Sequence, residues 1–147
     1  MIKDSVQRKM IYKKETIDVN TAEAEEWQLL SGIGPTYARL IVEYRTNLGG
    51  FLDIEQVRSV YGLPDSTFQK IRPQLTFSPV EIRQLSINTA TSNELKKHPF
   101  LKWRQAQIIV NYRENHGDFE QVEDLKKIKA FDAAFVEKLK PYLTVEK

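Results

Sequence analysis

The sequence lacks several features that would indicate particular classes of protein. It contains no cysteine, which excludes disulfides, thiolate catalysis and cysteine-based zinc sites but leaves the compartment open. No window of about 18 consecutive apolar residues occurs, and no signal peptide is visible, so we expect no membrane contact from this chain itself. The protein is expected to be extracytoplasmic and membrane-anchored if an N-terminal anchor precedes Met1 in its natural form, and cytoplasmic otherwise.

Groupings of residues that are typical of catalysis are also missing. The two histidines, His98 and His116, lie far apart in the sequence and have neither metal-ligand spacing nor a serine in a recognisable nucleophile motif nearby. The segment "GIGP", residues 32–35, lacks the lysine and the hydroxyl residue that a phosphate-binding nucleotide loop requires. We therefore expect a protein that is not an enzyme and that has no cofactor, no metal site and no small-molecule substrate.

The net charge of +2 hides an uneven distribution of charge along the chain. Residues 1–16 have five basic and two acidic side chains, a sum of +3. Residues 17–78 have five and eight, a sum of −3, whereas residues 79–147 have twelve and ten, a sum of +2. The basic character therefore lies in the N-terminal tail and in the C-terminal half.

The sequence contains an internal repeat with a period of 68 residues. Shifting the chain by 68 residues aligns positions 20–77 with 88–145 without a gap, and seventeen of these 58 positions are identical. We call residues 17–77 copy one and residues 85–145 copy two. The domain organisation predicted from this repeat is a basic tail over residues 1–16, a first domain over 17–78, a linker over 79–84 and a second domain over 85–146.

The spacing of apolar residues in each copy is helical, and the residues that begin and end helices agree with it. Pro35 suits a first helical position, and Gly49 with Gly50 can end the same helix. Further N-caps are predicted at Asp53, at Thr91 with Glu94 as a capping box, and at Asp132. No alternating segment is long enough to indicate a sheet. The predicted fold class is all-α, with two tandem domains of four to five short helices each, in SAM-like bundles.

Two of the six glycines interrupt a helical pattern in copy one, in "LLSGIGPTYARLIVEYR", residues 29–45. A tight turn between helices favours glycine, and a missing side chain lets another molecule approach the main chain closely. The turn ends where the helix at Pro35 begins, and the first amides of that helix have no partner within it and carry partial positive charge. A phosphate oxygen is the natural ligand of such a turn, and main-chain amides contact it without reading sequence.

These residues resemble a known family. The set "NTA", "GIG" and "YR", followed by glycine and phenylalanine, is similar to the helix-hairpin-helix module of the DNA-receptor proteins of bacterial competence, over all of copy one and more weakly over copy two. The resemblance implies duplex DNA binding without sequence preference, through phosphates across the minor groove. Carried over by position, it implies contacts at Gly32, Ile33, Gly34, Pro35, Thr36 and Tyr37, and at Gly62 and Leu63 in a second hairpin.

The two copies depart from the family pattern in opposite ways. In copy two, "FLKW" replaces "GIGP", so both hairpin glycines are gone and another turn geometry is expected. Lysines surround this position and also a second hairpin that has lost its glycine, and Lys102 and Arg104 are the predicted phosphate-binding side chains of copy two. Copy one lacks the cation that family hairpins often have just after the turn, and Arg39 is its nearest positive charge.

Two functions remain open from the sequence. The first is double-stranded DNA binding, in which copy one binds the backbone and copy two adds cations. The second is a scaffold or protein-interaction module on a fold that has lost DNA binding. Other recurring residues are interpreted structurally: Tyr44 and Phe51 as packed rings, and Arg45 as a donor to helix-end carbonyls. Trp103 aligns with Pro35 and is expected to pack against its neighbours, with stacking on a base or sugar as the alternative.

Overall fold

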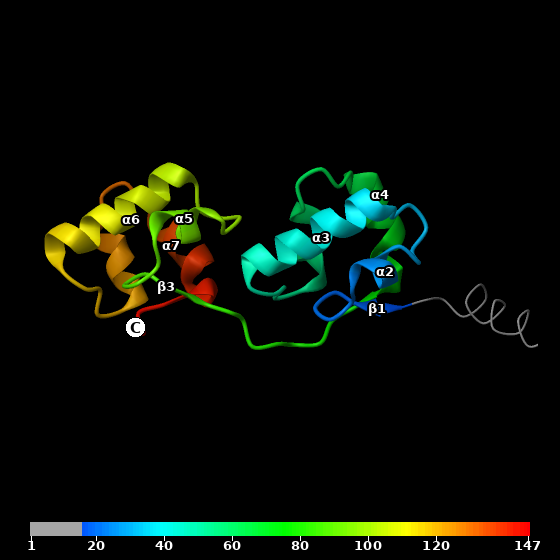
Figure 1. Cartoon of the computed structure of the whole chain (residues 1–147), viewed down its shortest axis with the longest axis horizontal. Coiled ribbons are helices and arrows are strands. Elements are labelled where there is room, and N and C mark those ends of the chain that lie inside the picture. The colour runs from blue at the N-terminus through cyan, green and yellow to red at the C-terminus, as the bar shows by residue number, and fades with distance from the viewer. Residues whose placement is uncertain (1–15) are drawn as a thin grey trace, which may run out of the picture. The chain divides into compact units, whose positions relative to one another are not determined.

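The computed structural model describes residues 16–147 (Figure 1). The basic tail predicted over residues 1–16 lies, except for Thr16, outside these residues. The chain divides into two compact units, one that ends at Val80 and omits residues 47–49, and one that consists of Asn47–Gly49 and Glu81–Lys147. Apart from residues 47–49, which belong to copy one, each unit contains one copy of the repeat, and the copies are described one at a time.

Copy one is built from five short helical segments between two very short strands. The strands are β1 (Ile17–Asp18) and β2 (Leu75–Thr76), one at each end of the copy. Between them the chain forms, in order, α2 (Ala24–Trp27), α3 (Pro35–Leu48), the 3-10 helix η1 (Ile54–Ser59), α4 (Asp65–Ile71) and the 3-10 helix η2 (Arg72–Gln74). The longest helix, α3, follows directly after the glycine turn.

Copy two repeats this order of elements. Its strands are β3 (Leu85–Ser86) and β4 (Leu143–Thr144). Between them lie α5 (Ser92–Lys96), α6 (Trp103–His116), η3 (Val122–Lys127), α7 (Ala133–Leu139) and η4 (Lys140–Tyr142). The prediction of two tandem all-α modules with four to five short helices each is therefore confirmed.

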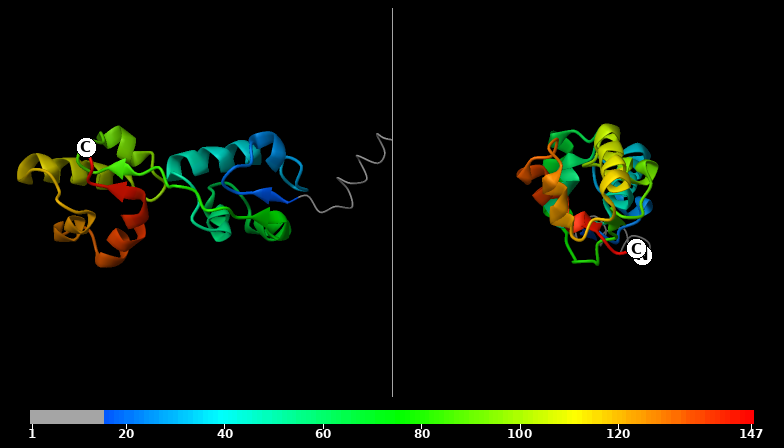
Figure 2. Two further views of the ribbon diagram at one scale, coloured as in Figure 1. Left: turned by 90° about the horizontal axis from the view of Figure 1, so that it is seen from below. Right: turned by 90° about the vertical axis from the view of Figure 1, so that its left-hand side faces the viewer.

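Short parallel strand pairs close each copy, and the sequence did not indicate them. β1 pairs with β2 with Ile17 opposite Leu75, and β3 pairs with β4 with Leu85 opposite Leu143. Figure 2 shows β3 and β4 side by side in its left view. Two residues are too few to show alternating polarity, which explains why the pattern gave no sign of them. Each pair ties the beginning of a copy to its end.

The helix ends follow the capping residues that the sequence contains. α3 begins at Pro35, and the carboxylate of Asp53 accepts from the N–H of Gln56 at the start of η1. Thr91 and Glu94 form the predicted capping box of α5, and Asp132 accepts from the N–H of Phe135 in α7. These predictions of helix starts are confirmed, with the difference that the helix after Asp53 is a 3-10 helix.

Each copy has a hydrophobic core of its own. Side chains that are fully buried include Trp27, Ile41, Phe51, Val57 and Phe68 in copy one, and Leu95, Ile109, Leu125 and Val136 in copy two. The predicted ring packing is present: the rings of Tyr44 and Phe51 stack at 6.1 Å between centroids, and those of Tyr112 and Phe119 at 5.4 Å. These residues recur in the repeat because they hold the core together.

An asparagine at the same position of each copy links three segments of chain. The side-chain amide of Asn20 donates to the carbonyls of Phe51 and Ser78, and its oxygen accepts from the N–H of Phe51. In copy two, Asn88 makes the equivalent two bonds with Phe119 and donates also to the carbonyl of Val145, one aligned position before the equivalent of Ser78. Arg45 donates to the carbonyls of Val19 and Ala22. It therefore binds main-chain carbonyls as predicted, but these lie in the turn before α2 and not at a helix end. These shared asparagine and arginine positions are structural.

Four turns of the structure have the same backbone hydrogen bond. In each, an N–H donates to the carbonyl three residues earlier, and both of these residues are buried, while the residue that follows the carbonyl is exposed. The pairs are Leu30 with Ile33, Val60 with Leu63, His98 with Leu101, and Ile128 with Phe131, at N···O distances of 3.0 to 3.1 Å. The hairpins of both copies therefore share one framework, whatever residues stand between the buried ends.

No helix within residues 16–147 combines the length and the apolar character needed to cross a bilayer.

Replacing Asn20 with alanine removes the donors and the acceptor that link the segments of copy one. We expect the free energy of unfolding to fall by about 2–4 kcal/mol, because the N–H of Phe51 loses its partner inside the protein. Urea unfolding followed by the emission of Trp27 reports on this copy, since Trp27 is fully buried whereas Trp103 is already exposed. Gln69→Ala, on the exposed side of α4, is the control, with an expected change within about 0.5 kcal/mol. Equal midpoints for the two variants would contradict the prediction.

Candidate functional site

The first hairpin of copy one has a turn that requires glycine at one position. Gly32 has a φ of 94°, a value that L-residues avoid and that the third residue of a type II turn requires. The N–H of the next residue, Ile33, donates to the carbonyl of Leu30 and closes the turn. Gly32 is therefore needed by the backbone itself.

Gly34, two residues on, has no such structural reason to be glycine. Its φ is not positive, and a Cβ built on it would find no atom within 4 Å. Pro35 and Thr36, which follow it at the start of α3, are also exposed. The missing side chain at Gly34 leaves the outer surface of the turn open to approach by another molecule.

Several main-chain N–H groups of this hairpin have no partner in the protein. Within residues 16–147, no group accepts a hydrogen bond from the N–H of Gly32 or Gly34. The amides of Thr36 and Tyr37, in the first turn of α3, likewise have no side-chain cap in the described chain. Free amides at the start of a fourteen-residue helix form a group of donors that is suited to an anion.

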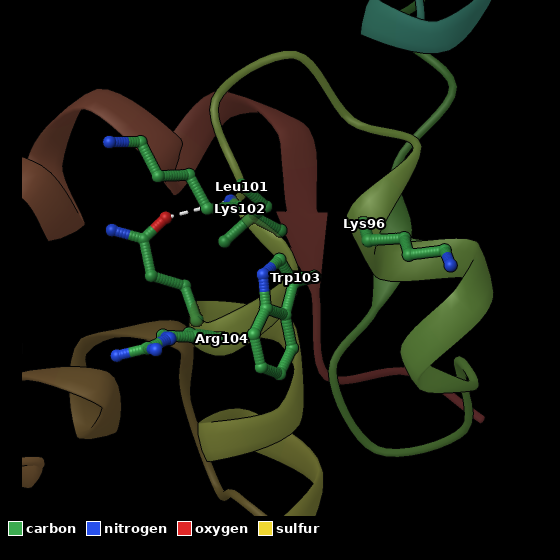
Figure 3. A pocket seen from close by; sticks show the side chains of 6 residues that line it. Lys96, Leu101, Lys102, Trp103 and Arg104 are labelled. Carbon is green, nitrogen blue, oxygen red and sulfur yellow. Dashed lines mark hydrogen bonds between the residues drawn. The ribbon is translucent and has the colours of Figure 1, made fainter.

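The amides at the same places in copy two are already bonded within the protein. The N–H of Phe100, which aligns with Gly32, donates to Nδ1 of His98 at 3.1 Å. The N–H of Lys102, which aligns with Gly34, donates to Oε1 of Gln105 at 2.8 Å, the dashed line of Figure 3. Copy two therefore keeps the hairpin but not its free donors.

The turn of copy two differs because Phe100 does not have a positive φ. This excludes a type II turn and confirms the expectation of another turn geometry. The aromatic ring of Phe100 packs against His98 and Tyr142, with centroid distances of 5.3 and 5.4 Å, and under the ammonium group of Lys138 at 4.2 Å. A side chain thus fills the place that glycine leaves open in copy one.

The second hairpin of copy one lies beside the first. Gly62 also has a positive φ, of 86°, and a Cβ on it would meet Leu40 of α3 at 3.3 Å. A Cβ on Gly32 would in turn lie 3.7 Å from Thr67 of α4. Each hairpin therefore packs against the helix that follows the other, and the exposed ring of Tyr61 projects from the second.

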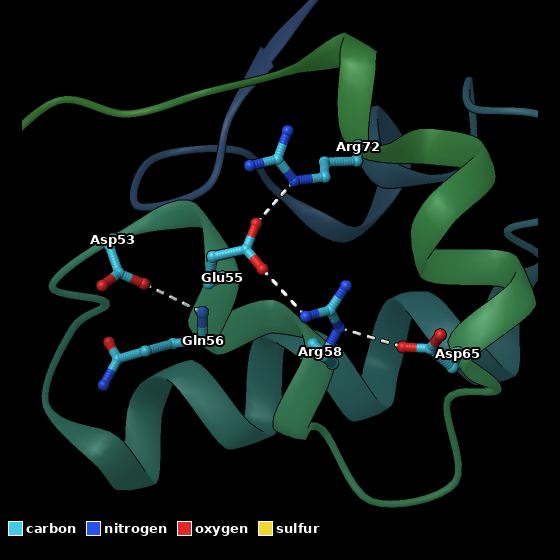
Figure 4. Close-up of polar contacts among 6 residues, drawn as sticks. All are labelled: Asp53, Glu55, Gln56, Arg58, Asp65 and Arg72. Atoms are coloured by element: carbon cyan, nitrogen blue, oxygen red, sulfur yellow. Dashed lines mark hydrogen bonds and ion pairs between the residues drawn. The ribbon is translucent and has the colours of Figure 1, made fainter.

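Acidic and basic side chains alternate around the second hairpin (Figure 4). Nε of Arg58 lies 2.9 Å from Asp65 in the first turn of α4, and Nη1 of Arg58 lies 3.0 Å from Glu55. Glu55 also contacts Arg72, at 2.5 Å. These pairs leave no excess of positive charge at the second hairpin, and a carboxylate stands at the start of its helix, where an anion would otherwise bind.

The cations predicted to bind phosphate differ in whether a carboxylate pairs with them. Arg39 lies 3.3 Å from Glu43, in a pair exposed to solvent on both sides. Lys102 and Arg104 are exposed, and no carboxylate pairs with either in the part of the chain that the structure describes. Near the second hairpin of copy two, Lys126 pairs with Glu137 at 2.6 Å, a contact that lowers the pKa of that carboxyl. Lys129, within that hairpin, is exposed and has no carboxylate partner in the described chain, so copy two has available positive charge at both of its hairpins.

Trp103 is exposed, which corrects the expectation that it packs against its neighbours. Its exposed fraction is 63%, because it begins α6 while the core face of that helix lies at Ala106 and Ile109. Figure 3 shows the indole beside a surface pocket, with Lys96 of α5 on the other side. The pocket is lined by Lys96, Leu101, Lys102, Trp103, Arg104 and Gln105.

Some of the hairpin residues predicted to bind DNA are exposed in the structure, and two of them are buried. Gly32, Gly34, Pro35 and Thr36 form an exposed surface, with Tyr37 half-buried beside them and Gly62 exposed at the neighbouring hairpin. The side chains of Ile33 and Leu63 are buried, and their amides close the turns, so these two residues anchor the hairpins. No group of three or more histidine, aspartate or glutamate residues suited to a metal ion occurs in residues 16–147.

From the sequence, two residues were given no part in the hairpins, although both lie there in the structure. His98 aligns with Leu30, and nothing in its surroundings marked it as an acceptor for the turn. Tyr61, 89% exposed, stands directly before the glycine of the second hairpin, and this position could have identified it. An aromatic residue outside a known motif is usually assigned to the core. The exposure of Tyr61 was therefore not predicted.

Comparison with known proteins identifies relatives of this chain. The family described as "Helix-hairpin-helix motif" matches residues 12–76 and 80–144. Endonuclease/exonuclease/phosphatase family domain-containing protein 1 of Mus musculus is 28% identical over 167 aligned positions, which cover 94% of this chain and 29% of that protein. ComE operon protein 1 of Bacillus subtilis is 39% identical over 64 residues, or 44% of this chain and 31% of that protein.

A further relative is an uncharacterized protein of Haemophilus influenzae, 39% identical over 64 residues, which cover 43% of this chain and 57% of that protein. This chain spans about 29% of the length of the vertebrate relatives that it matches. No solved structure matches it.

The two glycines of the first hairpin should respond differently to alanine. Gly32→Ala is expected to lower the free energy of unfolding by about 1–2 kcal/mol, because a residue with a Cβ is forced to a positive φ. Steric overlap adds nothing, since the new Cβ would lie 3.7 Å from Thr67. Gly34→Ala is the matched control and should be neutral or stabilise by about 0.4–1 kcal/mol. Urea unfolding measures both, and equal destabilisation by the two changes would contradict this account of the turn.

The stability of copy two should depend on pH through His98. Burial lowers the pKa of His98 from 6.5 to about 4, so the unfolded chain binds a proton in the range between these values while the folded protein does not. Stability therefore falls as the pH falls through 6.5, by about 1–2 kcal/mol between pH 7 and pH 5. The variant His98→Leu, which carries the residue of copy one, should lose this dependence. Urea midpoints at both pH values measure it, and identical slopes for the two proteins would refute it.

Proposed function

We propose, from the premise that this chain belongs to the helix-hairpin-helix family, that it binds duplex DNA without sequence preference. The observation that carries the proposal is the set of main-chain N–H groups in copy one, at Gly32 and Gly34, that have no acceptor within the described chain. The same positions in copy two are bonded internally. Donors left open in one copy and closed in the other indicate a ligand for the first.

The chemistry of these donors suits a phosphate of the DNA backbone. Phosphate oxygens accept hydrogen bonds and are negatively charged, and the first turn of α3 adds the positive end of its helix dipole. Gly34 has no side chain to keep the backbone of DNA at a distance. Main-chain amides reach only phosphates and sugars, so the contact fixes the position of the protein without selecting a sequence.

In the proposed complex, the second hairpin of copy one extends the contact, and copy two contributes charge. Gly62 and the exposed ring of Tyr61 lie at the neighbouring hairpin, on an acidic surface that is largely neutralised by arginine pairs. Lys102 and Arg104 of copy two are free to bind phosphates through their side chains. Since much of this attraction is electrostatic, the affinity is expected to be micromolar or weaker and to fall steeply with salt.

The relatives are consistent with this proposal and set its limits. The similarity to ComE operon protein 1 covers 44% of the chain, about the length of one copy, and supports a role like that of the competence DNA receptors. The name of the vertebrate relative describes a protein of which this chain spans 29%. We therefore do not carry the activity in that name over to this chain.

The second candidate function is a scaffold or protein-interaction module. The internally bonded amides of Phe100 and Lys102 favour it for copy two, because they leave that hairpin without free main-chain donors. The net charge of −3 over residues 17–78 favours it for copy one. The free amides of copy one favour DNA.

The variant Gly34→Asp tests the proposed function, because it places a carboxylate where the phosphate is expected. Affinity for a labelled 20-base-pair duplex, measured by fluorescence anisotropy over a salt series, should fall about tenfold or more, the effect of losing one charge-assisted hydrogen bond. Since Gly34 has no positive φ and open space around it, the fold should not change.

Ser78→Asp is the matched control, because it adds the same charge at an exposed position directly after copy one, in the same compact unit. Ser78 lies beside Asn20 and Phe51, just past the end of α3 that is opposite to Gly34. Fourteen residues of helix separate the two ends by about 20 Å. A similar loss of affinity in both variants, or no binding by the native chain at low salt, would refute the proposal.

A further inference from the structure

The exposed indole of copy two lies among cations that no carboxylate of the described chain pairs with. We propose that this surface, which we call the Trp103 surface, binds single-stranded nucleic acid, with an unpaired base stacked on Trp103 and phosphates held by the surrounding cations. Its six residues are Lys96, Leu101, Lys102, Trp103, Arg104 and Gln105, around a surface pocket of about 660 Å³. The inference rests on the proposed function only in taking the partner to be a nucleic acid. It assigns to copy two a ligand that is separate from the duplex bound by copy one.

The packing of copy two gives no reason for a tryptophan at this position. α6 contributes Ala106 and Ile109 to the core, both fully buried, whereas Trp103 is 63% exposed. Leu101, 4% exposed, closes the turn and forms the apolar base of the pocket. In copy one the same place is occupied by Pro35, which starts its helix without an aromatic ring. Exposing a large apolar ring gains nothing for folding, so the ring is suited to an external partner.

The cations near Trp103 differ from several other lysines of copy two, which pair with carboxylates. Lys126 and Lys127 pair with Glu137 and Asp124, and Lys140 pairs with Glu123. By contrast, no carboxylate pairs with Lys96, Lys102 or Arg104 in the described chain. Lys97 and Lys129 also form no ion pair with a carboxylate in the described chain, so the Trp103 surface is distinguished by an exposed aromatic ring among unpaired cations. Its partner should be an anion.

The arrangement of these groups selects a flat anionic partner. The guanidinium of Arg104 lies over the indole at 5.3 Å from the ring centroid, which adds a cation to the stacking position. In Figure 3 the pocket opens between the indole and Lys96. A nucleotide combines a flat ring with a phosphate, and single-stranded nucleic acid is bound by aromatic rings within positively charged grooves. In a duplex the faces of the bases are covered by stacking, so an unpaired strand fits this surface better.

Trp103 itself can report the binding. The chain has two tryptophans, and Trp27 is fully buried, so a ligand that stacks on the surface changes the emission of Trp103. Titration with a twelve-nucleotide oligothymidine should quench this emission. An abasic oligonucleotide of the same length has the same charge but no bases, and it should bind more weakly and quench little. Equal binding of the two would overturn the proposal and indicate a purely electrostatic surface.

Variants of the full chain locate the stacking position. With labelled oligothymidine, Trp103→Ala should weaken binding about fivefold or more, the usual effect of losing one stacked base, whereas Trp103→Phe should retain most of the affinity. Leu52→Ala removes an exposed apolar side chain from copy one, away from its hairpins, and is the control, with no expected change. An effect of Leu52→Ala as large as that of Trp103→Ala, or none from Trp103→Ala, would overturn the assignment. Trp103 is exposed, so its variants should fold, and circular dichroism checks this.

Two further measurements distinguish this inference from the proposed function and from a protein partner. Gly34→Asp should lose duplex binding and keep the Trp103-dependent binding of oligothymidine. If the native chain binds oligothymidine in this way but no duplex, the proposed function fails and this inference stands. If duplex binding is present but oligothymidine does not bind, this inference fails alone. Quenching by polyglutamate as strong as that by oligothymidine would overturn it in favour of an acidic protein partner.

Discussion

The hairpins of this protein depend on one hydrogen bond, from an N–H to the carbonyl three residues earlier, between two buried residues. Burial fixes both ends of the turn, because each end contributes an apolar side chain or an imidazole to the core. The two residues between the ends contribute little to the core, so they can be substituted without loss of the hairpin. This explains how copy two keeps the closing hydrogen bond of each hairpin after losing every glycine that copy one has there.

The conformation of the residues between those ends decides which main-chain donors each hairpin leaves free. Type I and type II turns differ in the orientation of the central peptide. The torsion angles on either side of it, ψ of the second residue and φ of the third, differ by about 150–170°. The N–H of Phe100 points to His98 in copy two, whereas the N–H of Gly32 has no acceptor in the described part of copy one. The replacement of Leu30 by His98 in the repeat thus does more than change a core side chain. It supplies the acceptor that closes the donor site.

The sequence predicted the features that depend on neighbouring residues and missed those that depend on distant ones. The caps at Asp53, Thr91 and Asp132 were predictable because a cap bonds within three residues. The pairing of β1 with β2 joins segments 58 residues apart and leaves no local pattern. The exposure of Trp103 depends on which face of α6 meets the core, and an aromatic residue at a helix start fits either outcome. The sequence predicted that the helix start in copy one has free amides. It could not predict that the matching amides of copy two are bonded, because their acceptor atoms are known only from the structure.

Charge explains why the two copies can carry different kinds of site. A main-chain site needs no cationic side chain, because its donors and the helix dipole act within a few ångströms, and it can therefore function in a copy with a net charge of −3. At physiological salt the repulsion from that charge is screened beyond about 8 Å. A site made of side chains needs uncompensated cations, and copy two leaves Lys96, Lys102 and Arg104 unpaired within the described chain. On the proposed function, copy two supplies the longer-range attraction and copy one the close contact, so neither charge distribution alone describes the protein.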